Sequence, residues 1–185
     1  MSALAETLRS LAHVFGEQGL RWYVFGAQAV VVRGAPRATQ DVDVTVFVEP
    51  EGRRAMVSAL IDAGLRHRFP DIAEQLIDAG AVLAVTHPSG MDIDLVFAGT
   101  GLERLAMERA TTEALAGVPV PVVQATELVV MKVLAGRGKD LDDVQSLLVG
   151  GEVDLDEARD LLGQLEAALG QSDLLPRLEQ CLRDA

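Results

Sequence analysis

The sequence predicts an α+β or α/β domain followed by a C-terminal helical subdomain. Up to residue 124, segments that alternate apolar and polar residues, as half-buried strands do, are mixed with segments whose apolar residues recur at helical spacing. From residue 125 onward, only helical spacing recurs. We therefore divide the chain into a core of strands and helices, residues 1–124, and a helical subdomain, residues 125–185.

In the core, the apolar spacing and the glycines that follow it predict helices at residues 3–18, 28–33, 51–63, 71–80 and 102–109. Strands are expected at residues 22–25, 41–48, 81–86 and 91–97, and a His-Pro-Ser-Gly turn joins the last two as a hairpin. Pro119 and Pro121 interrupt residues 118–123. Because proline cannot donate to a ladder, this segment can only be an edge strand or an extended segment.

In the subdomain, Thr126 is expected to cap a helix over residues 127–135, which the glycines at 136 and 138 end. Further helices are expected at residues 140–148, 155–169 and 174–182. The last two are amphipathic. They are therefore expected to pack on their own domain, with contact to a partner protein as the alternative.

Composition and charge narrow the class of protein. The net charge is −12, but from Asp140 to the C-terminus there are 12 acidic and three basic residues, so the acidity lies mostly in the tail. The chain lacks the broad basic surface of a protein that binds long RNA. A single cysteine, an N-terminus unlike a signal peptide and no long apolar run point to the cytoplasm and away from the membrane.

Asp41 and Asp43 are the first candidate functional residues. They lie two apart on a predicted strand, so both side chains leave the same face. Two carboxylates this close repel each other unless a cation lies between them. The simpler alternative is a solvated strand face that tolerates both aspartates.

Residues just before this pair favour a phosphate site. Gly26 and Ala27 stand at a strand-to-helix junction, where backbone N–H groups can bind phosphate. The loop that leads into Asp41 carries Arg33, Arg37 and the hydroxyl of Thr39. A guanidinium group can bond two phosphate oxygens at once, although such a loop can also be an ordinary solvated surface.

A second pair of carboxylates, Asp92 and Asp94, shares a face of another predicted strand. A third carboxylate beside Asp41 and Asp43 would complete a site for two Mg²⁺ ions, which prefer oxygen ligands and substrate phosphates. We favour Asp94 as the ligand. Asp92 then lies next to the metal site without being a ligand, or replaces Asp94.

The segment that begins Phe25-Gly26-Ala27 resembles a known signature. After 13 residues it continues as Asp41-Val-Asp43-Val, and together these resemble the signature of the polymerase-β-like nucleotidyltransferase superfamily. The string from Gly26 to Asp43, with Arg-x-Thr-x-Asp-x-Asp at its end, is similar to the abortive-infection (AbiEii-like) branch. Ala27 stands where the superfamily often has Ser or Gly, so a hydroxyl contact to phosphate is missing.

The only two lysines of the chain, Lys132 and Lys139, fall in a second segment that is similar to a motif of that branch. There a helix with Lys is followed by Arg-x-Lys-Asp and a further Asp, here Arg137 to Asp140 and then Asp143. The resemblance implies that Lys132 contacts a triphosphate. It also implies that Arg137, Lys139 and Asp140 lie near the nucleotide or shape the wall beside it.

The resemblance implies a mixed sheet flanked by helices and the transfer of NMP from an NTP, with two Mg²⁺ ions bound by Asp41, Asp43 and Asp94. The acceptor hydroxyl could belong to a tRNA 3′ end, a protein or a small molecule. Some members of the branch are toxins, which implies an antitoxin partner. The alternative is a nucleotide-binding regulatory module that keeps the fold without turnover.

Overall fold

The structure, a computed structural model, describes residues 2–34, 39–99 and 101–185. The strands are β1 (Arg21–Phe25), β2 (Asp41–Phe47), β3 (Arg66–His67), β4 (Leu83–Thr86), β5 (Asp92–Phe97), β6 (Thr111–Leu115) and β7 (Val118–Val122). The α-helices are α1 (Ala3–Glu17), α2 (Gly26–Val32), α3 (Arg53–Asp62), α4 (Ala73–Ala79), α5 (Gly101–Arg109), α6 (Ala125–Ala135), α7 (Gly138–Val149), α8 (Leu155–Leu169) and α9 (Leu174–Asp184). Pro50–Gly52 and Pro70–Ile72 form short 3-10 helices, η1 and η2.

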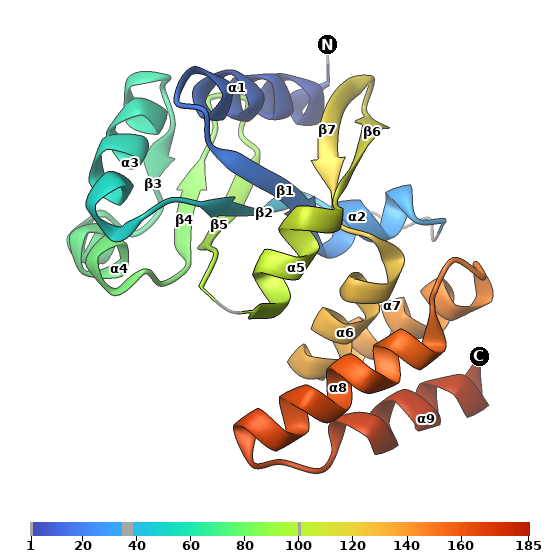
Figure 1. Cartoon of the computed structure of the whole chain (residues 1–185). Coiled ribbons are helices and arrows are strands. Elements are labelled where there is room, and N and C mark those ends of the chain that lie inside the picture. Colours follow the sequence, from blue (N-terminus) through green and yellow to red (C-terminus); the bar gives the residue numbers. More distant parts are fainter. Residues whose placement is uncertain (1, 35–38, 100) are drawn as a thin grey trace.

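The described strands form one sheet in the order β3-β4-β5-β2-β1-β7-β6 (Figure 1). β2 runs parallel to β5 and antiparallel to β1, while β1 runs parallel to β7. The sheet is therefore mixed, which confirms the α+β class and the mixed sheet that the resemblance implied.

Alternation along β2 explains how this strand serves both the core and a polar face. Val42, Val44 and Val46 are fully buried, whereas Asp41 and Asp43 on the opposite face are partly exposed. Burying each valine stabilises the sheet by roughly 1.5–3 kcal/mol. The valines thereby fix the register of β2 and the direction in which both aspartates point.

The proline-rich segment is a strand but does not lie at the edge. β7 lies between β1 and β6, so the expectation of an edge position was wrong. Pro119 and Pro121 lie opposite residues of β6, while β1 is registered with β7 at Val122. The prolines fit because they lie beyond the stretch that pairs with β1.

Two strands were missed. β6 carries little apolar periodicity because it is an exposed edge strand, and β3 is two residues long. Thr126 does not cap α6, which begins at Ala125, two residues before the expected start, with Gln124 as its N-cap residue. Its hydroxyl instead accepts a hydrogen bond from the backbone N–H of Asp154 at 2.9 Å, which ties α6 to the start of α8.

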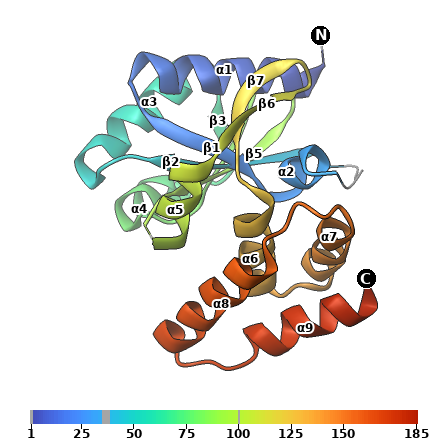
Figure 2. The same cartoon turned by 45° about the vertical axis from the view of Figure 1, so that its right-hand side comes forward.

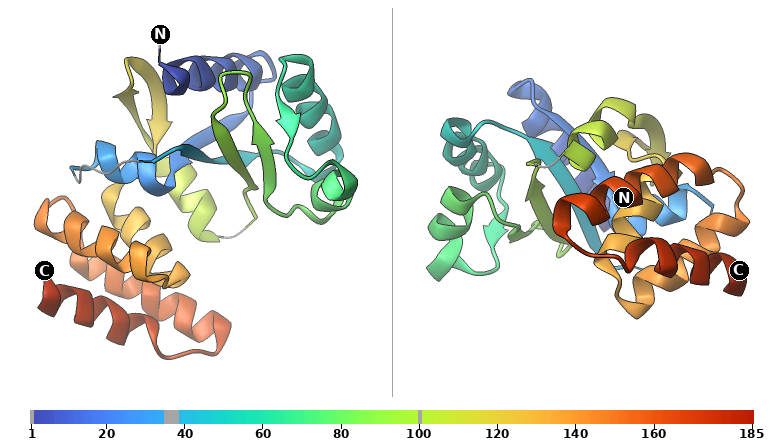
Figure 3. Two further views of the ribbon diagram at one scale, coloured as in Figure 1. Left: turned by 180° about the vertical axis from the view of Figure 1, so that it is seen from behind. Right: turned by 60° about the horizontal axis from the view of Figure 1, so that its bottom comes forward.

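The four C-terminal helices gather on the side of the sheet away from α1 (Figures 2 and 3). α8 and α9 pack through buried Leu162, Leu174 and Leu178, which join the hydrophobic core. Packing on their own domain, as expected, is thus confirmed for these faces. Within the described residues, no helix combines the length and apolar character needed to cross a bilayer.

Candidate functional site

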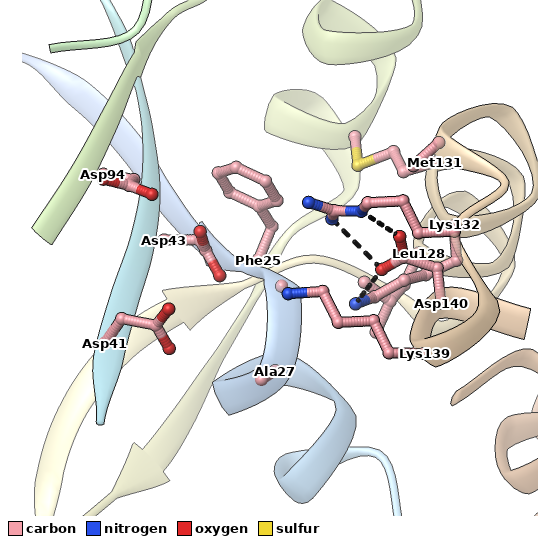
Figure 4. A pocket seen from close by; sticks show the side chains of 13 residues that line it. Phe25, Ala27, Asp41, Asp43, Asp94, Leu128, Met131, Lys132, Lys139 and Asp140 are labelled. Carbon is pink, nitrogen blue, oxygen red and sulfur yellow. Dashed lines mark hydrogen bonds and ion pairs between the residues drawn. The ribbon is translucent and has the colours of Figure 1, made fainter. Parts of the chain in front are cut away.

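A pocket of about 150 Å³ lies where the sheet meets α6 and α7 (Figure 4). It is lined by Phe25, Gly26, Ala27, Asp41, Asp43, Asp94, Leu128, Met131, Lys132, Ala135, Arg137, Lys139 and Asp140. The pocket therefore brings together two segments that are far apart in the sequence. These are the segment from Gly26 to Asp43 and the lysine segment, which runs from Lys132 to Asp143. Most of the residues singled out from the sequence are among those that line it.

The parallel pairing of β2 and β5 assembles the carboxylates. Its register places Asp41 beside Asp92 and Asp43 beside Asp94, so all four side chains rise from one face of the sheet. Asp94 lines the pocket together with the β2 pair. Asp92 does not line it, and its Oδ1 accepts a hydrogen bond from the hydroxyl of Thr86 at 2.7 Å. This placement favours Asp94 over Asp92 as the third carboxylate.

Asp43 is the central member of the three pocket-lining aspartates, Asp41, Asp43 and Asp94. Its pKa is raised from 3.8 to about 6, first by burial and then by the charges of Asp41 and Asp94, against the lowering effect of Lys132 and of a hydrogen bond with the backbone of Ala27. A cation beside Asp43 would offset both the cost of burying its charge and the repulsion from Asp41 and Asp94. The electrostatics of the pocket therefore suit a bound positive ion.

Gly26 allows Asp43 to take this position. Its φ is +63°, and a Cβ built on it would lie 1.8 Å from the carboxylate Oδ2 of Asp43. A side chain at residue 26 would therefore displace the carboxylate. Next to it, Ala27 is buried and offers its backbone to Asp43 but no hydroxyl, so the N–H predicted to bind phosphate contacts a carboxylate in this structure.

The loop before β2 contributes less than expected. The hydroxyl of Thr39 hydrogen-bonds Asp41 Oδ1, which orients that carboxylate. Arg33 points away, since its Nε donates to the backbone oxygen of Val123 at 2.9 Å and its Nη1 pairs with Glu113 at 3.0 Å. Arg33 thus braces β6 and β7, and its proposed phosphate contact was wrong. Arg37 lies outside the described residues.

The wall opposite the carboxylates is built on a buried ion-pair network. Lys132 Nζ donates to Asp140 Oδ1 at 2.9 Å and to Asp143 Oδ2 at 2.8 Å, and all three side chains are buried. Burial alone would raise the pKa of Asp140, but hydrogen bonds from Arg137 and Lys132 hold it below its ordinary value. This network joins α6 to α7, so much of the charge of Lys132 is balanced inside the protein.

Arg137 and Lys139 are the more accessible cations of this wall. Arg137 pairs with Asp140 but keeps most of its side chain exposed, and its Nη2 lies 3.2 Å from Asp140 Oδ1. Lys139 is exposed, and its ammonium points into the pocket toward Asp43 and Ala27 (Figure 4). Both side chains can therefore reach a polyanion held between the wall and the sheet.

Sequence reasoning missed two contributors. Asp143 stood within the lysine segment as a further acid, and its role as the second buried partner of Lys132 required the packing of α6 on α7. Arg68 was missed because it follows the very short β3. Its Nη1 lies 3.3 Å from Asp94 Oδ1.

The side chains of Asp41, Asp43 and Asp94 fit a hard divalent cation, since each of them offers carboxylate oxygens as ligands. Among the described residues, however, no set of three His, Cys, Asp or Glu side chains is already close enough together to hold a metal ion. Asp41, Asp43 and Asp94 are therefore not arranged as three ligands of one ion in this structure.

Solved structures with this fold include nucleotidyltransferases. The solution structure of antibiotic-resistance factor ANT(2'')-Ia matches with a TM-score of 0.54 and 14% identity over 88% of this chain and 91% of that one. Its crystal structure with adenylyl-2''-tobramycin matches with a TM-score of 0.53 and 14% identity over 89% and 97%. An antigenic nucleotidyltransferase-like protein from Paracoccidioides brasiliensis matches with a TM-score of 0.52 and 17% identity over 94% and 91%.

No curated protein sequence matches this chain. A family model does. The model of the nucleotidyl transferase AbiEii toxin of type IV toxin–antitoxin systems matches residues 9–184. Because that match spans nearly the whole sequence and agrees with both motifs, the chain belongs to the AbiEii nucleotidyltransferase toxin family.

Proposed function

We propose that this chain transfers NMP from an NTP to an acceptor hydroxyl in a Mg²⁺-dependent reaction. The observation that carries the proposal is the pocket in which Asp41, Asp43 and Asp94 face Arg137 and Lys139. An NTP needs both sides, since its metal requires carboxylates and its phosphates require cations. The family and the fold agree with nucleotidyl transfer as the general activity.

In this reaction Asp41, Asp43 and Asp94 hold the divalent cations. Bound Mg²⁺ would supply charge stabilisation at the α-phosphate and at the attacking and leaving oxygens. Lys139 and Arg137 contact the triphosphate, while Lys132 and Asp140 hold that wall in place from the interior. The acceptor oxygen bonds to the α-phosphorus as the bond to the bridging oxygen breaks, so pyrophosphate and the hydroxyl proton leave.

The acceptor hydroxyl belongs to one of three classes: a tRNA 3′ end, a protein or a small molecule. The adenylylated tobramycin complex of ANT(2'')-Ia suggests including an aminoglycoside in any panel. The family description suggests a toxin whose activity an antitoxin protein counters. The acidic tail makes a compact acceptor easier to accommodate than a long RNA.

The test is incubation with each labelled NTP, Mg²⁺ and the three acceptor classes, measuring pyrophosphate release and label transfer. We expect Asp43→Asn to lower the rate at least about a hundredfold, since metal contacts are worth several kcal/mol in the transition state. Asp142→Asn, an exposed aspartate on α7, is the matched control and should leave the rate unchanged. Full activity in Asp43→Asn contradicts the proposal.

A regulatory module that binds nucleotide without turnover is the second candidate. The observation in its favour is Ala27, which lacks a hydroxyl and whose backbone is hydrogen-bonded to Asp43. NTP binding with no label transfer to any acceptor class would support the module. In that case Lys139→Met would weaken NTP binding while no variant changed pyrophosphate release.

A further inference from the structure

Arg68 contacts both carboxylates of β5. Its Nη1 lies 3.3 Å from Asp94 Oδ1, and its Nε lies 3.7 Å from Asp92 Oδ2. Its guanidinium also lies over the ring of Phe69, 5.7 Å from the ring centroid. The Arg68 side chain is 35% exposed. One guanidinium beside the pocket-lining Asp94 thus faces two carboxylates and rests on an aromatic ring.

The topology puts Arg68 on the outer side of Asp94. Arg68 follows β3 at the end of the sheet, and its backbone N–H donates to Ala84 on β4 at 3.0 Å. Asp94 on β5 has β4 on one side and β2, which carries Asp43, on the other. Asp94 therefore lies between the Arg68 guanidinium and the β2 carboxylates, and its Oδ1 faces that guanidinium.

The contact between Arg68 and Asp94 explains why Asp41, Asp43 and Asp94 do not form a three-ligand metal cluster in this structure. Asp43 and Asp94 are opposite each other in register, yet the described residues contain no three-ligand cluster. The ion pair with Arg68 engages one oxygen of Asp94, while the negative charge of Asp43 repels it from the other side.

We propose that Arg68 is a positioning residue, the resident counter-cation of Asp94, which holds this carboxylate away from Asp43 until a divalent cation takes its place. The inference rests on the proposed function, because it takes Asp41, Asp43 and Asp94 as the metal site. It adds a built-in competitor that makes cation binding to the nucleotide-free protein weak.

Removing the Arg68 charge should therefore tighten cation binding in the absence of nucleotide. A unit charge several ångströms away in a half-exposed site changes affinity by about three- to tenfold. Arg68→Gln removes the charge. Arg68→Lys keeps it, but a single ammonium cannot span both carboxylates as the planar fork does.

The experiment measures Mn²⁺ binding to the nucleotide-free protein by the electron paramagnetic resonance signal of free Mn²⁺. We expect Arg68→Gln to bind Mn²⁺ about three- to tenfold more tightly than wild type. Arg68→Lys should stay near wild type, because the competing charge remains. Unchanged or weaker binding in Arg68→Gln overturns the proposal.

Arg54→Gln is the matched control. Arg54 also contacts two carboxylates, those of Glu74 and Asp78, but on the exposed surface between α3 and α4. Its removal should leave Mn²⁺ affinity at the wild-type value. An equal gain in Arg54→Gln would mean that net charge alone sets the affinity, which also overturns the specific role of Arg68.

Asp43→Asn separates failure of this inference from failure of the proposed function. If wild type binds Mn²⁺, loses it in Asp43→Asn and binds equally in Arg68→Gln, the metal site stands and the counter-cation role falls. If Mn²⁺ binding is the same in wild type and Asp43→Asn, the metal site itself is wrong. A lower Mg²⁺ concentration for half-maximal transfer in Arg68→Gln would support the role by a second readout.

Discussion

Asp43 is charged at neutral pH in a position that disfavours its charge. Its pKa of about 6, raised first by burial and then by Asp41 and Asp94, lies above the ordinary value of 3.8. The folded state therefore binds a proton more tightly than the unfolded state. The stability that this group contributes is full below about pH 4 and is lost as the pH rises through 6.

Asp43→Asn should consequently stabilise the metal-free protein at pH 7. The amide keeps an oxygen for the backbone of Ala27 but carries no charge, so we expect a gain of about 1–2 kcal/mol after allowance for solvent screening. Urea unfolding with a chelator at pH 7 and at pH 4 measures it, and the gain should shrink at pH 4. A loss of stability at pH 7 relative to Asp142→Asn would contradict the electrostatic account.

Gly26→Ala tests the close approach of backbone and carboxylate. Gly26 and Gly19 share a φ of +63°, but a Cβ on Gly19 meets nothing within 4 Å, whereas one on Gly26 meets Asp43. Gly19→Ala should lose only about 1 kcal/mol of unfolding free energy, the cost of the left-handed backbone. Gly26→Ala should lose more and also weaken Mn²⁺ binding. Equal losses with intact Mn²⁺ binding would mean that the Asp43 contact is unimportant.

The residues of the site differ in how far sequence could predict them. Asp41, Asp43 and Gly26 could be predicted because local patterns identify them: the strand period of two for the aspartates, and the strand-to-helix junction for the glycine. Arg68 and the structural role of Arg33 were not. Both depend on contacts with residues at least 24 positions away, Arg68 with Asp92 and Arg33 with Glu113, and a local pattern carries no record of such contacts.

At the scale of elements, a buried ion-pair network joins α6 to α7, and the two lysines differ in their part in it. Lys132 is buried between Asp140 and Asp143, whereas Lys139 is exposed at the mouth of the pocket. The resemblance implied that Lys132 contacts a triphosphate and that Lys139 lies near the nucleotide or shapes the wall beside it. The structure brings both lysines to the pocket but gives the interior pairing to Lys132.

Lys132→Met should destabilise the fold by about 3–5 kcal/mol, because it leaves two buried carboxylates without their ammonium partner. Lys139→Met is the matched control and should change stability by less than about 0.5 kcal/mol. Lys139→Met should instead weaken NTP binding in a fluorescence titration. If Lys132→Met were as stable as Lys139→Met, the network would not be what joins α6 to α7.

The elements themselves were largely predictable where periodicity is strong. β2, β5 and α8 follow their patterns, since each buries one face. β6 was missed and β7 was misplaced because the position of a strand in a sheet depends on its partners. The prolines of residues 118–122 carry no information about β6, the exposed edge strand that pairs with them.

On the scale of the whole molecule, the pocket belongs to both parts of the chain. The carboxylates come from the sheet, and Arg137 and Lys139 come from the start of α7. Arg109 at the end of α5 adds a second link, since it pairs with Glu127 on α6 and with Glu157 on α8. A ligand held between the two sides therefore stabilises their association as well as each side.

We accordingly expect residues 1–124 and 125–185 to unfold together, and NTP with Mg²⁺ to raise the midpoint of that single transition. Trp22, the only tryptophan, lies on β1 and reports on the sheet by fluorescence, while far-UV circular dichroism reports mainly on the helices. At a hundredfold excess of ligand over Kd the stabilisation is about 2.7 kcal/mol, so both signals should shift by the same amount. A shift of the fluorescence midpoint alone would mean that the nucleotide contacts the sheet but not α6 and α7. A shift that Lys139→Met reduces in both signals would place the phosphates against the helical wall.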